Sequence, residues 1–354
     1  MAIGGGEPVC RPERHEGNTV SWTEVVHADV HEFLPVMEAQ SVQCVVTSPP
    51  YWGLRDYGVE GQIGLEPTPD AYVETLVEVF REVRRVLRDD GTAWCNLGDS
   101  YAQTTTRHRG ETINRYTPGG AWKQNTNGAW IDNRKGTATG GLKPKDLCMI
   151  PARVALGLQA DGWYLRSDII WAKGISFCAS YSGSVMPESV RDRPTQSYEH
   201  VFLLTKSPQY YYDADAVREI GTFPAGTRAA KGSGTREGNR RGGDGKVKAA
   251  YQGPLKRGQG NDGYAIYSGY RNLRSVWAIG TKPYKAAHFA TFPPALVEPC
   301  IKAGSKRGSL VLDPFCGSGT VGEVCRRFRR NFIGVELNED YVALANARIA
   351  AARQ

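Results

Sequence analysis

The sequence predicts an α/β fold built on a doubly wound, mostly parallel sheet. Short apolar segments rich in β-branched residues alternate with segments of helical periodicity, which is typical of βαβ units. With 354 residues, of which 40% are apolar, the chain can bury a substantial core. Two long polar stretches interrupt the alternation, and we expect them to be insertions in the α/β body.

Six apolar runs predict strands, because β-branched and aromatic residues dominate each run and turn residues flank it. They cover Gln43–Thr47, Thr92–Leu97, Tyr164–Trp171, His200–Thr205, Ser309–Asp313 and Asn331–Glu336. Helical periodicity between these runs predicts five helices. They cover Pro69–Arg88, Pro151–Ala160, Pro294–Ala303, Gly319–Arg329 and Glu339–Ala351. For the first helix we expect Thr68 as the start and Gly91 as the stop, and for the last helix Asn338 as the cap.

The two polar stretches, 104–145 and 221–274, differ in charge. The second carries thirteen glycines and eleven Lys or Arg against three acidic residues, whereas the net charge of the whole chain is +7. The rest of the chain is therefore close to neutral. A basic, glycine-rich segment with interleaved tyrosines favours a surface that binds a polyanion, of which nucleic acid is the commonest. A merely solvated loop is the alternative.

Composition also excludes several classes of protein. No apolar run approaches the roughly 20 residues needed to span a bilayer. The N-terminus lacks the apolar region of a signal peptide, so we expect a cytoplasmic protein. The eight cysteines form no Cys-x-x-Cys pair, and there are only six histidines. We therefore expect reduced thiols and no metal site.

A first motif lies near the C-terminus, where a buried strand ends at Asp313 and the chain turns through glycines into a helix. A second strand delivers Glu336 twenty-three residues later. This layout suits an adenosine moiety, because glycines let a ligand approach the backbone and the second carboxylate can bind ribose hydroxyls. Gly317, Gly319 and Gly322 also fit the dinucleotide spacing, so an NAD-binding unit is an alternative. Against it, only eighteen residues follow Glu336, too few for the remaining strands of such a fold.

A second motif, Thr47-Ser-Pro-Pro-Tyr51, follows another apolar strand. The two prolines remove backbone donors, so that Ser48 and the Pro49 carbonyl form an acceptor-rich pocket beside the ring of Tyr51. Such a pocket suits a planar amine, because acceptors hold the amine hydrogens while the ring stacks on the base. A rigid turn that closes the strand is the structural alternative.

The two motifs, in this order, resemble those of S-adenosylmethionine-dependent DNA amino-methyltransferases of the permuted (beta) group, in which the catalytic half precedes the cofactor half. The similarity extends through Arg166–Lys173 and Glu199–Lys206. The resemblance implies a circularly permuted, Rossmann-like methyltransferase fold. It also implies a catalytic half at 20–220 with the insertion 104–145, a target-recognition insertion at 221–274, and a cofactor-binding half at 275–354.

The resemblance further implies roles for individual residues. Ser48, Pro49, Pro50 and Tyr51 are the predicted catalytic residues. The predicted cofactor-binding residues are Asp29, His288, Phe289, Thr291, Asp313, Pro314, Phe315, Cys316, Gly317, Ser318, Gly319, Thr320, Glu336 and Leu337.

The expected reaction is methyl transfer from S-adenosylmethionine to the N4 amine of cytosine in double-stranded DNA, after the base has been flipped out of the stack. In the family, serine at the position of Ser48 is associated mainly with N4 of cytosine, and Asp or Asn with N6 of adenine. Methylation of adenine N6 is therefore the alternative. A catalytically idle DNA-binding protein and an RNA or protein amine methyltransferase are further alternatives. A cognate restriction endonuclease is a possible partner.

Overall fold

The computed structural model describes residues 22–54, 58–102, 142–173, 190–221, 228–229, 265–266, 269–281 and 292–353. Most of the predicted insertions 104–145 and 221–274 lies outside these residues. The chain divides into two compact units, one of Asp213–Arg274 and the other of everything else. Among the described helices, none is long and apolar enough to cross a membrane.

The larger unit is built on an eight-stranded sheet with the order β1-β12-β11-β2-β3-β5-β4-β10. The strands are β1 (Thr23–His27), β2 (Val42–Thr47), β3 (Leu87–Leu97), β4 (Tyr164–Ala172), β5 (Tyr198–Thr205), β10 (Val276–Ala278), β11 (Leu310–Asp313) and β12 (Asn331–Glu336). All neighbouring pairs are parallel except the two that involve β5. The predicted α/β class with a mostly parallel sheet is confirmed.

The reversed direction of β5 decides which residues share an edge of the sheet. The seven parallel strands end at one edge, which we call the carboxyl edge, and β5 begins there because it runs the other way. In open α/β sheets, ligands bind outside the carboxyl ends of the strands. The carboxyl edge is therefore where a site is expected.

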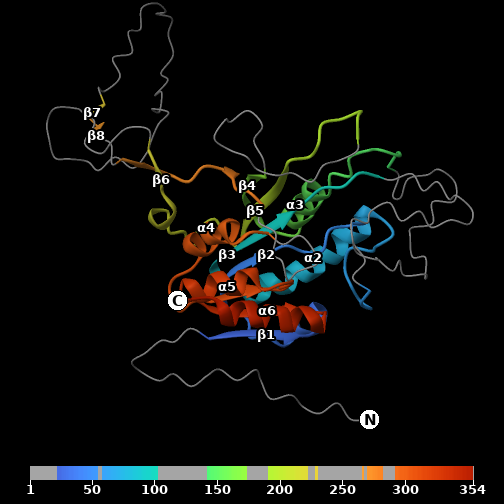
Figure 1. Ribbon diagram of the computed structural model, residues 1–354, viewed down its shortest axis with the longest axis horizontal. Coiled ribbons are helices and arrows are strands. Elements are labelled where there is room, and N and C mark those ends of the chain that lie inside the picture. Colours follow the sequence, from blue (N-terminus) through green and yellow to red (C-terminus); the bar gives the residue numbers. More distant parts are fainter. Residues whose placement is uncertain are drawn as a thin grey trace, which may run out of the picture. The chain divides into compact units, whose positions relative to one another are not determined.

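Helices cover both faces of the sheet. The helices α1 (Val30–Val36), α2 (Pro69–Val86) and α3 (Ile150–Ala160) pack in series on one face. The helices α4 (Pro294–Gly304), α5 (Thr320–Arg327) and α6 (Glu339–Ala351) pack in series on the other, and Figure 1 shows these three together along one side of the sheet. The main apolar core lies between the first group of helices and the sheet.

Local signals explain where the helices begin. The Thr68 side chain accepts a hydrogen bond from the Ala71 backbone at the start of α2, and Pro69 occupies the first turn, as predicted. Asn338 caps α6 in the same way, by accepting from the Asp340 backbone. Both predicted caps are confirmed.

The predicted end of α2 is wrong. The helix ends at Val86, two residues before the predicted Arg88, and Gly91 does not stop it but lies inside β3. Leu87 pairs with Val42 of β2 and is completely buried. Sheet pairing and burial of Leu87 therefore override the helical periodicity. The short, half-polar β1 and the helix α1 that follows it have no counterpart among the predicted elements.

The smaller unit is described only in part. β6 (Glu219–Ile220) pairs antiparallel with β9 (Tyr270–Arg271), and β7 (Arg228–Ala229) pairs antiparallel with β8 (Ala265–Ile266). Glu219 accepts hydrogen bonds from the side chains of Arg271 and Arg274, at 2.9 and 2.8 Å. These ion pairs join the two ends of the basic insertion, while its own boundaries remain a prediction.

Candidate active site

The two sequence motifs meet at the carboxyl edge. β2, which leads into Ser48, and β11, which ends at Asp313, are neighbouring parallel strands. The Thr47 hydroxyl donates to Asp313 Oδ1 at 2.7 Å, across 266 positions of sequence. A turn of the cofactor motif and a turn of the catalytic motif therefore lie side by side.

Asp313 is a fully buried carboxyl at the end of β11. Its Oδ1 also accepts from the Phe315 backbone at 3.1 Å, whereas its Oδ2 is buried with no hydrogen-bond partner among the described residues. Burial disfavours the charged form and raises the pKa of Asp313 to about 7, although the hydrogen bonds from Thr47 and Phe315 oppose this change. Asp313 thus offers an unused acceptor, or a donor when it is protonated, beside the glycine turn.

Glu336 holds the glycine turn to the neighbouring strand β12. Its Oε2 accepts from the Gly317 backbone at 2.7 Å, and its Oε1 accepts from the Asn338 backbone at 2.9 Å. Burial raises the pKa of this carboxyl as well. Each oxygen has a further lone pair, which is the acceptor set that ribose hydroxyls require. The carbonyl of Leu337, the next residue, lies 3.0 Å from His27 Nε2.

The glycines of the turn serve different purposes. Gly317 and Gly319 both have positive φ, 51° and 77°, which residues with a Cβ rarely adopt. A Cβ at Gly319 would lie 2.9 Å from the backbone of Ala345 on α6, so this glycine permits helix packing. A Cβ at Gly317 would meet nothing within 4 Å. Gly317 therefore leaves open space beside the backbone, into which a ligand can fit.

Ser318 and Thr320 use their hydroxyls within the fold. Arg348 of α6 donates from Nη1 to Ser318 Oγ at 2.9 Å and to Thr320 Oγ1 at 2.7 Å. The same guanidinium pairs with Glu323 at 2.7 Å. Both residues were predicted to bind the cofactor, and the structure places their side chains against Arg348. Arg348 thus fixes the shape of the turn.

The remaining predicted cofactor residues are placed as follows. Asp29 follows β1, whose partner is β12, and its Oδ1 accepts from the His31 backbone at 2.8 Å. Asp29 and Glu336 therefore stand at the ends of neighbouring strands. Cys316 is buried, and its sulfur lies where a side chain on Gly334 would be. Pro314 and Phe315 complete the turn after β11. His288, Phe289 and Thr291 lie outside the described residues.

The catalytic motif is held by side chains on three further strands. Tyr51 Oη donates to Glu199 Oε2 at 2.7 Å, and Asn96 Nδ2 lies 2.7 Å from Tyr51 Oη and 2.8 Å from Glu199 Oε2. Lys173, at the end of β4, forms an ion pair with Glu199 Oε1. We call Tyr51, Asn96, Glu199 and Lys173 the tyrosine network. The sequence reasoning matched the segments that contain Lys173 and Glu199 but gave these residues no role.

Ser48 makes only long contacts with this network. Its Oγ lies 3.4 Å from Tyr51 Oη and 3.4 Å from Asn96 Nδ2. Burial first, and the nearby charge of Glu199 second, raise the pKa of Tyr51 well above its usual value, so the phenol stays neutral. The Pro50 carbonyl already accepts from Tyr72 Oη at 2.8 Å. Trp52 is buried, and its Nε1 donates to the Glu66 carbonyl at 2.9 Å, so it belongs to the core.

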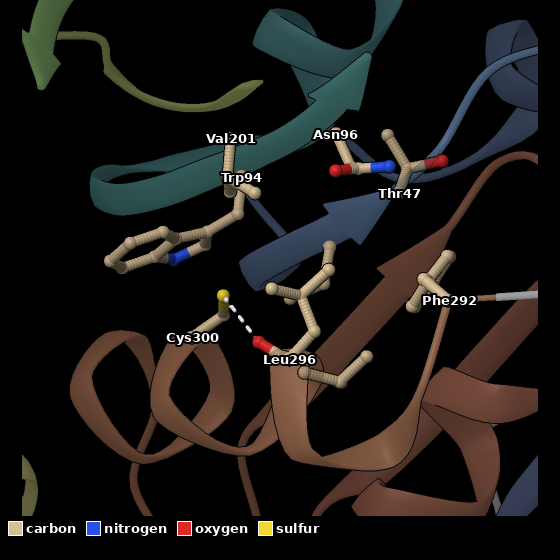
Figure 2. A pocket seen from close by; sticks show the side chains of 9 residues that line it. Thr47, Trp94, Asn96, Val201, Phe292, Leu296 and Cys300 are labelled. Atoms are coloured by element: carbon tan, nitrogen blue, oxygen red, sulfur yellow. Dashed lines mark hydrogen bonds between the residues drawn. The ribbon is translucent and has the colours of Figure 1, made fainter. Parts of the chain in front are cut away.

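A small apolar pocket lies below the carboxyl edge on the side of α4. It is lined by Val46, Thr47, Trp94, Asn96, Val201, Phe292, Leu296, Val297 and Cys300. Figure 2 shows Thr47 and Asn96 next to each other above the pocket, with Phe292 on the segment that leads into α4. The Asn96 Oδ1 is buried and has no partner among the described residues. Since Phe292 follows the predicted cofactor residue Thr291 directly, the pocket adjoins both motifs.

Comparison with known proteins gives consistent matches. A family model described as DNA methylase, for N6 and N4 methyltransferases, matches residues 42–347. The type II methyltransferase M.XycI of Xanthomonas campestris pv. cyanopsidis is 44% identical over 347 residues, which are 98% of this chain and 92% of the relative. The type II methyltransferase M.Cfr9I of Citrobacter freundii is 42% identical, over 95% of this chain and 90% of the relative.

Two solved structures share the fold. The PvuII DNA methyltransferase, named as cytosine-N4-specific, superposes with a TM-score of 0.56 at 18% identity, over 93% of this chain and 87% of that chain. A DNA modification methylase of Thermus thermophilus, solved in complex with S-adenosyl-L-methionine, superposes with a TM-score of 0.50 at 21% identity, over 94% of this chain and 93% of that chain. At these identities the match concerns the fold.

Proposed function

The chain belongs to the N6/N4 DNA methylase family, and we propose that within this family it methylates the N4 amine of cytosine. At the level of the family, the protein is a type II DNA methyltransferase that uses S-adenosylmethionine. The family membership removes the NAD-binding alternative. The choice of cytosine N4 is our proposal.

One observation carries the mechanism, namely the hydrogen bond of 2.7 Å between Thr47 and Asp313. It brings the Ser-Pro-Pro-Tyr turn next to the turn that the family uses for the cofactor. When bound, the cofactor supplies an electrophilic methyl group on a sulfonium. We propose that Glu336 holds the ribose of this group, while the open side of Gly317 and the free Oδ2 of Asp313 receive its remaining polar parts.

The chain's own residues would then act on the target amine. Ser48 Oγ, which makes only contacts of 3.4 Å in the structure, accepts a hydrogen of the amine and turns the nitrogen lone pair out of conjugation. The Tyr51 ring stacks on the base. A strong base is not needed, because the amine becomes far more acidic once it carries the methyl group and can then lose a proton to water.

The target base must leave the duplex, because its amine cannot otherwise face the methyl group. We propose that the basic insertion 221–274 contacts the DNA phosphates and reads the recognition sequence. Its surplus of positive charge supports this role. Because the relatives are named type II methyltransferases, we also propose a cognate restriction endonuclease and, with DNA as the substrate, a cytoplasmic location.

Serine at position 48 supports cytosine N4, since the group that the chain resembles associates serine there with this amine. The structural neighbour named as cytosine-N4-specific agrees with this choice. The test is mass spectrometry of nucleosides from unmethylated genomic DNA that has been treated with the enzyme and cofactor. We expect N4-methylcytosine. N6-methyladenine without N4-methylcytosine would overturn the proposed specificity.

A variant of Ser48 tests the assigned role. Ser48→Ala should lower the transfer rate by about 100-fold, because it removes the acceptor that aligns the amine. The affinity for the cofactor should stay unchanged, since Ser48 lies on the catalytic turn. Calorimetric titration of the cofactor, together with tritium transfer to DNA, measures both quantities. A variant that keeps its transfer rate would remove Ser48 from the mechanism.

A further inference from the structure

The tyrosine network contains a buried ion pair that the mechanism above does not use. Glu199 is 9% exposed and pairs with Lys173. Its position depends on the antiparallel direction of β5, which brings the beginning of that strand to the carboxyl edge. Removing a carboxylate from water is costly unless charge and hydrogen bonds compensate. Glu199 has such partners on both oxygens, and one of the partners is the catalytic tyrosine.

The two oxygens of Glu199 have separate partners. Oε1 binds Lys173, whereas Oε2 accepts from Tyr51 Oη at 2.7 Å and from Asn96 Nδ2 at 2.8 Å. An ionised carboxylate is an acceptor only. The hydroxyl hydrogen of Tyr51 must therefore point towards Glu199, and the lone pairs of Tyr51 Oη face away from it.

This direction passes on to Ser48. The Ser48 hydroxyl lies 3.4 Å from Tyr51 Oη and is oriented to donate to it. When its hydrogen points to Tyr51, the lone pairs of Ser48 Oγ are free to accept from a target amine. If Tyr51 pointed its hydrogen at Ser48 instead, it would occupy the lone pair that the amine needs.

We propose that Glu199 is a positioning residue for methyl transfer, which fixes the hydrogen-bond direction of Tyr51 and thereby keeps Ser48 an acceptor for the target amine. This inference rests on the proposed function of Ser48 as the group that binds the amine. It gives Lys173 a role too, because Lys173 holds the other oxygen of Glu199 and so determines which oxygen faces Tyr51.

Replacing Glu199 by glutamine makes the proposal testable. Lys173 carries only donors, so the amide oxygen of glutamine must turn towards it. The amide NH2 then occupies the place of Oε2 and donates to Tyr51 Oη. The Tyr51 hydrogen is pushed towards Ser48, and the network reverses. Glu199→Gln should therefore lower the single-turnover rate of methyl transfer by about 10- to 100-fold, with less than about threefold change in the affinities for cofactor and DNA.

Removal of the tyrosine hydroxyl provides the readout that a merely structural role would not move. In Tyr51→Phe there is no hydroxyl to reverse, so the double variant Tyr51→Phe/Glu199→Gln should have the same rate as Tyr51→Phe alone. Losses that multiply would overturn the proposal, because they would show that the two residues act independently. Glu82→Gln is the matched control, since Glu82 pairs with Arg85 on α2, and it should leave the rate unchanged.

A second pair of substitutions covers the case in which Glu199→Gln does not fold with an unpaired Lys173. Lys173→Gln/Glu199→Gln buries no charge, and its two amides can pair with each other while the amide at position 199 turns its oxygen back to Tyr51. This variant should transfer methyl groups within about fivefold of the wild-type rate. If it folds, binds the cofactor normally and is still as slow as Ser48→Ala, the proposal is wrong.

The measurement separates this inference from the proposed specificity. Total tritium transferred to unmethylated genomic DNA reports the effect of Glu199 whichever amine is methylated. Identification of the methylated nucleoside reports the target amine. A wild-type enzyme that makes N6-methyladenine would overturn the cytosine proposal alone. Equal rates for the wild type and Glu199→Gln would overturn the positioning role alone.

Discussion

The buried carboxyl of Asp313 makes the stability of the protein depend on pH in an unusual direction. Burial raises the pKa of Asp313 from 3.8 to about 7. In the folded protein this group therefore holds its proton at pH values at which the unfolded chain has lost it. Because the folded state binds more protons, its stability falls as the pH rises between the two values, and below pH 3.8 the contribution vanishes.

The size of the effect follows from the same shift. Each pH unit between the two pKa values costs about 1.4 kcal/mol of unfolding free energy. Between pH 5 and pH 8 the slope holds up to about pH 7 and then levels off, so Asp313 should contribute a loss of about 2.5 kcal/mol. Asp313→Asn cannot ionise, and its amide oxygen keeps the bonds from Thr47 and Phe315. This variant should not show the loss.

Urea denaturation of the cofactor-free protein at several pH values between 5 and 8 measures the difference. We expect Asp313→Asn and the wild type to differ least at pH 5, and the variant to gain on the wild type by about 2.5 kcal/mol by pH 8. Asp89→Asn, which changes an exposed carboxyl paired with Lys206, is the matched control. Parallel pH curves for the wild type and Asp313→Asn would refute the reasoning.

Three further predictions concern the cofactor half. Gly319→Ala should destabilise the protein more than Gly308→Ala in urea denaturation, because both glycines have positive φ but only the first meets backbone, 2.9 Å away in α6; equal losses would contradict the packing role. Arg348→Met should cost about 3 kcal/mol, because it removes the bonds to Ser318, Thr320 and Glu323, whereas Arg81→Met, at an exposed pair with Asp161, should cost less than about 1 kcal/mol. Glu336→Gln should weaken cofactor binding about tenfold in calorimetric titration, because glutamine has one acceptor oxygen for two backbone donors; an unchanged affinity, equal to that of the exposed Glu339→Gln, would exclude this role.

Local sequence signals were sufficient for most elements of the fold. The six predicted strands and five predicted helices are all present, since each carries its own apolar period and its own start signal, such as Thr68 before Pro69. β1 was missed because Thr23–His27 is short and only half apolar, and it is held mainly by pairing with β12. The end of α2 was misplaced for a related reason, because pairing of Leu87 with β2 has no local signature.

The candidate site divides in the same way. The order of the motifs, with Ser48 early and Asp313 late, is written in the sequence, as are the glycines that a tight turn needs and the surplus of basic residues at 221–274. These features follow from residue type and spacing, so the chain alone specifies them. They were enough to indicate the family and the chemistry of an amine methyltransferase.

Only the tertiary structure decided which side chains surround the reacting residues. Glu199 and Lys173 reach Tyr51 because β5 runs antiparallel between β3 and β4, which brings the start of one strand and the end of another to the same edge. Strand direction is set by long-range pairing and burial, which leave little trace in the local sequence. The same holds for the hydroxyls of Ser318 and Thr320, which lie in the glycine motif but are bound by Arg348 from the last helix.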